Sequence, residues 1–332
     1  MSLTVGHRSR SRSRNKPKNK VRADIQGLRA IAVIAVILDH LLGWPLGGFV
    51  GVDIFFVVSG FLITGLLLRE YDRTGTISFK GFYRRRAKRI LPASVLVLVV
   101  TAVAAFLVFN VARATSTFWD AVWAFFFAAN WNFAAAGTDY FQSGGAVSPL
   151  QHFWSLAVEE QFYFVWPWLM LAIFIMGAKS KRWNRRTAHI SVGVAIAIIT
   201  AGSFIWAMSE TVNNPTYAYF STLSRSWELG IGAMLAVLTP ILSKIPLNAR
   251  PVLGWAGLIG IVVSVFAIND TLPFPAPWAL LPVLSAAVLI SGGTGGDQRF
   301  LWPICNPVTS YIGDISYSLY LWHFPVIILL GV

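Results

Sequence analysis

Long apolar runs follow one another along almost the whole chain, with short polar connections between them. A helix of about 20 apolar residues covers the hydrocarbon core of a bilayer. The pattern therefore predicts an all-α, polytopic membrane helical bundle with about ten hydrophobic segments. We expect these segments at 24–44, 48–68, 90–111, 117–136, 152–177, 188–208, 216–238, 251–268, 276–293 and 306–332.

The segment 117–136 is interrupted by Asn130 and Asn132. If it spans the membrane, the basic stretch 179–186 falls outside, although Lys and Arg favour cytoplasmic connections. A re-entrant or partial helix removes the conflict, because irregular backbone at membrane depth is tolerated where protein covers it. We favour this alternative, which predicts nine crossings; a spanning segment would make ten. The connection before 90–111 is basic, and Pro92 is expected in the first turn of that helix.

The charge is basic but its position argues against nucleic acid as a partner. The net charge is +13, with 56% hydrophobic and 12% charged residues. Of 27 Lys and Arg residues, eight lie in 1–22, eight in 69–89 and five in 179–186. This clustering between apolar runs is the positive-inside pattern. We expect 1–22 to be a disordered basic cytoplasmic tail and 23–332 to be one multi-pass domain in the cell membrane. The lone Cys305 can form no internal disulfide.

The first apolar segment contains Arg29, Asp39 and His40, and ionisable groups inside membrane helices are costly and usually functional. Arg29 and His40 are eleven residues apart, so they return to nearly the same helix face about 16 Å apart along the axis. A snorkelling arginine and a packed histidine are the structural alternative. Asp53 in the second segment is expected near the same outer end as His40.

Three further sets of polar residues interrupt apolar segments. Ser155 and Glu159 share a face, and Glu160 adjoins them. Arg225 and Glu228 have the i, i+3 spacing of an intramembrane ion pair. The last segment contains residues that could support a site or belong to an interfacial aromatic belt, namely Asp314, Tyr317, Tyr320 and His323.

A cationic cluster precedes the third segment, at Arg84, Arg85, Arg86, Lys88 and Arg89. Arg86 and Arg89 share a helix face. The cluster is compatible with simple membrane-surface charge. Because guanidinium groups bind phosphates in bidentate fashion, it also suits a phosphate-bearing donor.

Several of these stretches together resemble the acyltransferase-3 family of integral-membrane O-acyltransferases. The resemblance rests on the Arg29 and His40 pair and on five stretches in order, and it covers 22–332. The stretches are GVDIFFVVSGFLI, FYRRRAKRILP, SPLQHFWSLAVEEQFYFVWP, SRSWELGIG and ISYSLYLWHFP. The resemblance implies an enzyme that uses acyl-CoA, usually acetyl-CoA, and acylates hydroxyls of envelope or secreted carbohydrates or glycolipids. It implies that His40 is catalytic, that Arg29 supports it, and that Arg86 and Arg89 bind donor phosphates. Some members carry a further extracytoplasmic domain.

The residues by themselves allow a compatible mechanism. His40 can accept a proton near neutral pH, and a carboxylate such as Asp39, Glu159 or Glu160 would orient it. Arg or Tyr donors would stabilise the oxyanion. An acyl-His relay remains open. No metal site is expected. A proton-coupled transporter or lipid flippase is the alternative, since it too would contain intramembrane charges.

Overall fold

A computed structural model describes residues 22–137, 140, 147–179, 183–296 and 298–331, and the predicted tail 1–21 lies outside this part. The described residues form helices joined by turns, without a strand. The helices are α1 (Ala23–Leu42), α2 (Gly51–Thr74), α3 (Phe79–Val108), α4 (Val111–Phe125), α5 (Ala129–Ala135), α6 (Phe153–Ala178), α7 (Arg185–Asn213), α8 (Pro215–Phe220), α9 (Thr222–Leu242), α10 (Ala249–Ala267), α11 (Leu280–Gly293) and α12 (Pro307–Leu330), with short 3-10 helices η1 (Gly48–Val50) and η2 (Arg299–Leu301).

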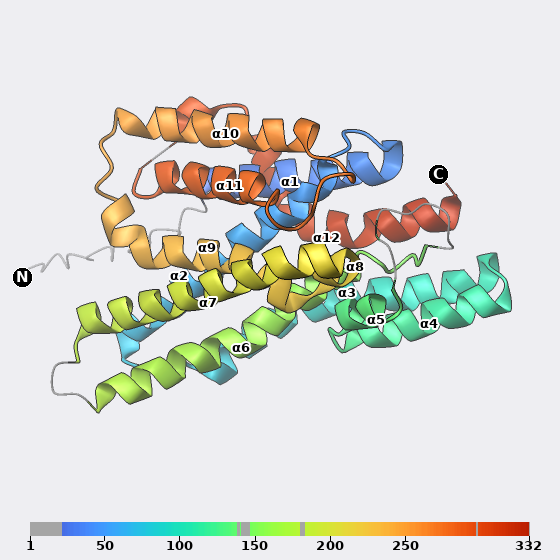
Figure 1. Cartoon of the computed structure of the whole chain (residues 1–332), viewed down its shortest axis with the longest axis horizontal. Helices are drawn as coiled ribbons and strands as arrows, with labels where there is room; N and C mark the ends of the chain where they lie inside the picture. Colours follow the sequence, from blue (N-terminus) through green and yellow to red (C-terminus); the bar gives the residue numbers. More distant parts are fainter. Residues whose placement is uncertain (1–21, 138–139, 141–146, 180–182, 297, 332) are drawn as a thin grey trace, which may run out of the picture.

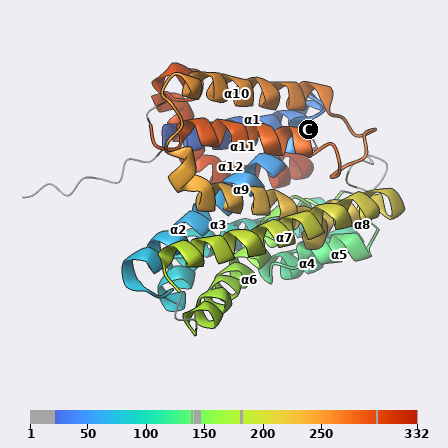
Figure 2. The same cartoon turned by 60° about the vertical axis from the view of Figure 1, so that its left-hand side comes forward.

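The helices form two groups with α2 and α9 between them. In both views α10, α11, α1 and α12 lie above this central pair, and α3 to α7 lie below it (Figures 1 and 2). The α2–α9 pair packs closely because both helices present glycine at the crossing. A Cβ on Gly60 or Gly232 would collide with backbone carbonyl oxygens of the facing helix. Small residues of this kind permit close approach of membrane helices.

Seven helices of the described chain are long and apolar enough to cross a membrane: α1, η1–α2, α3, α6, α7, α10 and α12. Each of the ten expected apolar segments overlaps at least one of the observed helices. The all-α membrane bundle is therefore confirmed. The count of nine or ten crossings stays a prediction.

The start of the third helix differs from the sequence-based expectation. α3 begins at Phe79 and not near Ile90, so Pro92 lies inside the helix and not in its first turn. Ser78 caps the helix, since its hydroxyl accepts a hydrogen bond from the Gly81 amide (3.3 Å). A cap satisfies one of the unpaired amides of the first turn. The whole basic cluster is consequently helical.

The interrupted segment 117–136 is two helices, α4 and α5, joined at Phe127, which has a left-handed φ of 53°. Asn130 and Gln161 hold this break. The Gln161 amide donates to the Phe127 carbonyl (2.8 Å) and to Asn130 (2.9 Å), and Asn130 donates to the Phe220 carbonyl (3.1 Å). The polar interruption seen in the sequence thus marks a helix break whose freed backbone is satisfied by protein.

The basic connections gather at one end of the bundle, which we call the basic end. Figure 1 shows the start of α1, the end of α6 and the start of α7 at this end, and the end of α12 at the opposite end. Side-chain contacts join the connections directly. Trp183 donates to the Tyr71 hydroxyl (3.1 Å), and His189 contacts the Asp72 carboxylate (3.1 Å). Residues 69–89 and 183–186 therefore share one side, as the charge pattern predicted.

Cysteine labelling tests which side of the membrane the basic end faces. In a Cys305→Ser background, we expect cysteines at the exposed Thr76 and Arg186 to resist an impermeant thiol reagent added outside intact cells. A cysteine at the exposed Asp270, in the connection after α10, should react and serves as the control. Labelling of Thr76→Cys from outside would reverse the orientation.

Candidate active site

A polar vestibule of about 960 Å³ opens at the basic end. It lies between α1, α2, α3, α7, α9 and α12, and four arginines line it: Arg22, Arg29, Arg69 and Arg89. Arg22, placed in the tail by the sequence analysis, belongs to the fold. Its guanidinium pairs with Asp24 (2.5 Å) and donates to Thr294 Oγ1 (3.1 Å). Arg29 donates to Gln26 (3.1 Å), whose amide in turn bonds Asp314 on α12.

A smaller polar cavity of about 100 Å³ lies deeper in the bundle, and Arg29 and Arg89 line both spaces. The predicted residues Arg86, Glu159 and Glu160 line this cavity together with Tyr317 and Tyr320. The fold thereby brings five helices, α1, α2, α3, α6 and α12, to one point. Arg29 and the α3 arginines line this cavity together with the α6 carboxylates.

Glu159 is held by two hydroxyl groups. Ser59 donates to one carboxylate oxygen (2.7 Å), and the Tyr163 hydroxyl donates to the other (3.3 Å). Arg86 lies over the Tyr163 ring, 4.3 Å from its centre. Sequence reasoning missed Ser59 and Tyr163, although Ser59 is a polar interruption of an apolar run in the stretch GVDIFFVVSGFLI.

The predicted cationic cluster divides between two directions. Arg86 and Arg89 face the cavity, as their shared helix face predicted. Arg84 and Lys88 are exposed and line neither space, and Arg85 pairs with Glu70 (3.4 Å) on the surface. Of the five side chains, Arg86 and Arg89 line the cavity, and Arg89 is itself exposed at the vestibule. Arg69, which the sequence analysis did not select, lines the vestibule with Arg89.

Three histidines meet beyond the cavity, near the end of α1. His40 Nδ1 lies 2.9 Å from His323 Nε2, and His40 Nε2 lies 2.8 Å from the Tyr140 hydroxyl. The His40 and His323 rings stack at 5.1 Å, and the His152 ring lies 5.4 Å from His323. His323, which the sequence analysis grouped with the polar residues of the last segment, is thus a direct neighbour of His40. His152 was not among the predicted site residues.

Pro325, inside α12, explains the position of His152. Pro325 has no amide hydrogen, so the Leu321 carbonyl lacks its usual i+4 donor. His152 supplies one, with its Nε2 3.1 Å from that carbonyl oxygen. A buried carbonyl in a membrane bundle needs such a partner. His152 therefore joins the start of α6 to the Leu321 carbonyl of α12.

The carboxylate expected beside His40 is not there. Both ring nitrogens of His40 have other partners, an imidazole and a phenol, and neither Asp39 nor Glu159 nor Glu160 is hydrogen-bonded to them. Asp39 precedes His40 by one residue, which on a helix turns its side chain by about 100° from that of His40. The expectation that one of these carboxylates orients His40 is thus not met in this structure.

Ser155 and Tyr320 connect the cavity to the histidines. Their hydroxyl oxygens are 2.7 Å apart and both line the cavity. The backbone carbonyl of Tyr320 is 2.6 Å from His323 Nδ1. Polar groups therefore line the way from the vestibule, past Glu159 and Tyr320, to His40. The last step runs through the Tyr320 backbone carbonyl and His323.

The predicted ion pair between Arg225 and Glu228 is confirmed, at 2.7 Å, and Asp53 is a second partner at 2.9 Å. All three side chains are buried. They join α2 to α9 beside the glycine crossing. The Arg225 guanidinium also lies over four aromatic rings, at 5.1–5.8 Å, including Trp154 and Tyr219. Tyr219 stacks on Tyr140 at 4.4 Å, so this ion cluster supports the wall beside His40.

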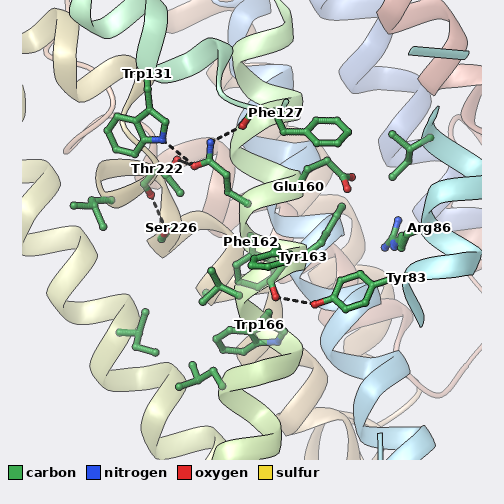
Figure 3. A pocket seen from close by; sticks show the side chains of 18 of the residues that line it. Tyr83, Arg86, Phe127, Trp131, Glu160, Phe162, Tyr163, Trp166, Thr222 and Ser226 are labelled. Carbon is green, nitrogen blue, oxygen red and sulfur yellow. Dashed lines mark hydrogen bonds between the residues drawn. The ribbon is translucent and has the colours of Figure 1, made fainter. Parts of the chain in front are cut away.

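An apolar groove of about 700 Å³ runs along α3, α6, α7 and α9. Arg86, Glu160 and Tyr163 line both the groove and the polar cavity. Figure 3 shows Trp131 and Thr222 at the end of the groove remote from Tyr83 and Arg86. The Tyr83 hydroxyl donates to the Phe164 carbonyl (2.9 Å) and closes the groove against α3.

We expect the Arg225 cluster to dominate stability. Replacing Arg225 with Gln leaves two buried carboxylates without a cation and should cost about 3–5 kcal/mol. Glu228→Gln keeps one cation with one carboxylate, so its loss should be clearly smaller. Thermal unfolding in detergent, followed by tryptophan fluorescence, measures both. Equal melting temperatures for Arg225→Gln and wild type would contradict this role.

Comparison with known proteins identifies the family. A family model described as an acyltransferase domain, of the acyltransferase-3 type, matches residues 22–332. Relatives include the peptidoglycan O-acetyltransferase OatA of Listeria monocytogenes (35% identity, 92% of this chain, 49% of the relative). Others are the putative O-acetyltransferase SACOL0978 of Staphylococcus aureus (37%, 91% and 50%) and the putative peptidoglycan O-acetyltransferase YrhL of Bacillus subtilis (33%, 92% and 48%).

The chain spans about half the length of these curated relatives. No solved structure matches it. The family model covers nearly every described residue, including the vestibule, the polar cavity and the histidines. This chain belongs to the acyltransferase-3 family.

Proposed function

We propose that this protein moves an acetyl group from cytoplasmic acetyl-CoA to a hydroxyl of a cell-envelope carbohydrate. The observation that supports this most is the series of polar groups that runs from the arginine-lined vestibule to His40 inside an apolar bundle. The names of the relatives, which are O-acetyltransferases, agree with it. In this proposal the basic end faces the cytoplasm, in keeping with its charge.

The vestibule is suited to the nucleotide end of the donor. The 3′,5′-ADP part of CoA carries several negative charges, and Arg22, Arg29, Arg69 and Arg89 line one space. Arginine binds phosphate through two parallel N–H groups. The extended pantetheine arm then enters the polar cavity past Arg29 and Arg89, which line both spaces.

The thioester reaches the region of Tyr320 and the histidines, about 16 Å along α1 from Arg29. The acceptor hydroxyl gives its proton to His40 while its oxygen attacks the thioester carbonyl carbon. The C–S bond then breaks, and the imidazolium returns the proton to the departing sulfur. Hydroxyl or guanidinium donors lining the path would stabilise the oxyanion. Tyr320, which lines the cavity, would serve that purpose.

Labelled donor tests the proposed reaction directly. Membranes containing the protein are incubated with acetyl-labelled acetyl-CoA and with envelope carbohydrate, and the label in each fraction is counted. We expect alkali-labile label in carbohydrate, as for an O-acetyl ester. A transporter or flippase would instead move a solute or lipid in response to a proton gradient and leave no ester. Label confined to lipid would assign a glycolipid acceptor in place of a wall glycan.

Changing His40 to Ala should lower acetyl transfer by at least about 10²-fold, because the general base is lost. Thermal unfolding should stay near that of wild type, since the side chain is only partly buried. Leu41→Ala is the control. Leu41 follows His40 on α1 and is 43% exposed. Normal transfer by His40→Ala would show that His40 is structural.

The double change Arg86→Gln and Arg89→Gln should raise the apparent Michaelis constant for acetyl-CoA at least about tenfold. Each charge-assisted contact to phosphate contributes about 1.5–3 kcal/mol. The matched control is Arg84→Gln, which removes an exposed charge from the same helix. An equal effect of Arg84→Gln would mean that the cluster acts only through general surface charge.

A further inference from the structure

We propose that His323 is the positioning residue for His40. The Tyr320 carbonyl fixes the tautomer of His323, and His323 in turn holds His40 with its Nε2 unprotonated, so that this nitrogen can act as the base. The inference rests on the proposed function, because it concerns the same base. His323 takes the place of the carboxylate that orients the histidine in a Ser-His-Asp triad.

The series of hydrogen bonds begins at a group that can only accept. The Tyr320 carbonyl oxygen is 2.6 Å from His323 Nδ1, so that nitrogen must carry hydrogen. In a neutral imidazole the other nitrogen is then an acceptor. His323 Nε2, 2.9 Å from His40 Nδ1, therefore accepts from it. His40 Nδ1 must donate.

The same reasoning leaves His40 Nε2 as the acceptor. That atom is 2.8 Å from the Tyr140 hydroxyl, which can donate to it. The Tyr140 oxygen thus lies where the hydroxyl of the carbohydrate substrate must lie to give its proton to His40 Nε2. A reversed series would require the Tyr320 carbonyl to donate, which it cannot do.

Packing around the pair prevents His323 from turning to another partner. His323 is 8% exposed, its ring stacks on His40 within 6° of parallel, and Phe324 contacts both rings. His152 is occupied by the Leu321 carbonyl and does not bond either imidazole. The orientation of His40 is therefore set by the Tyr320 carbonyl of α12, which acts through His323.

The arrangement also provides for the charge that catalysis creates. When His40 Nε2 takes a proton, the imidazolium keeps its Nδ1–H bond to His323. The proton between the two rings can shift to His323 Nε2, after which His323 donates to Tyr320 and to His40. The positive charge is then shared by two stacked rings, without a buried carboxylate.

Two replacements of His323 test the inference. Gln can place its carbonyl oxygen near the former Nε2 and accept from His40, whereas Leu fills the space but accepts nothing. We expect His323→Leu to lower kcat by about 10²–10⁴-fold, comparable to the loss of the orienting group in a catalytic triad. The KM for acetyl-CoA should not change. His323→Gln should recover most of the lost kcat.

His152→Leu is the structural control. It removes a buried bond to Leu321 and should lower the melting temperature while kcat stays near that of wild type. If His323→Gln and His323→Leu lose activity equally, and in proportion to their melting temperatures, the positioning role is wrong. Wild-type kcat in His323→Leu would also overturn it.

A second measurement does not depend on activity. Nitrogen NMR of protein with ¹⁵N-labelled histidine distinguishes protonated from bare ring nitrogens, and His40→Ala assigns the His40 signals. We expect hydrogen on Nδ1 and a bare Nε2 in wild type, with a mixture of tautomers in His323→Leu. Hydrogen on Nε2 in wild type would refute the inference even if transfer occurs. The expected tautomer without acetyl transfer would refute the proposed function alone.

Discussion

Inside hydrocarbon a polar group must find its partner within the protein, and this constraint governs the centre of the molecule. Arg225 meets it with two carboxylates and four aromatic rings at the α2–α9 crossing. The Leu321 carbonyl, left without a donor by Pro325, meets it with His152. These two solutions tie α2 to α9 and α6 to α12. The helices that form the polar cavity and the histidine cluster are among those they connect.

The kind of polar group in the interior changes from the basic end inward. At the basic end the polar groups are arginines that face a wide vestibule. Deeper in the bundle they become a carboxylate with two hydroxyl donors, and then three imidazoles. Such an order suits a reaction in which the anionic end of a donor stays at one side while its uncharged arm and acyl group reach inward.

Backbone carbonyl groups of α12 hold two of the three clustered histidines. Two successive carbonyls, of Tyr320 and Leu321, are bonded by His323 and His152. The stretch YLWHFP combines the two requirements for this: a histidine that reaches back one turn and a proline that frees a carbonyl. Aromatic residues around the rings keep other partners away. His40 is thereby held by neutral groups, which a search for a nearby carboxylate would overlook.

The sequence by itself determined the helical membrane class, the helix locations and the grouping of basic connections. Periodicity, length and charge are properties of local stretches. It also determined which of the α3 arginines share a face and that Arg225 pairs with Glu228, because three-residue spacing on a helix is a local relation. It misplaced the start of α3, since a cap at Ser78 can begin a helix before the apolar run does.

Tertiary structure decided every relation between residues far apart in the chain. Asp53 joins Arg225, Ser59 joins Glu159, and His323 takes the position expected for a carboxylate beside His40. These partners are separated by 100 to 283 residues along the chain. No periodicity in one helix specifies which face of another helix it will meet. That choice is made by close packing at glycines and by the need of each buried polar atom for a partner.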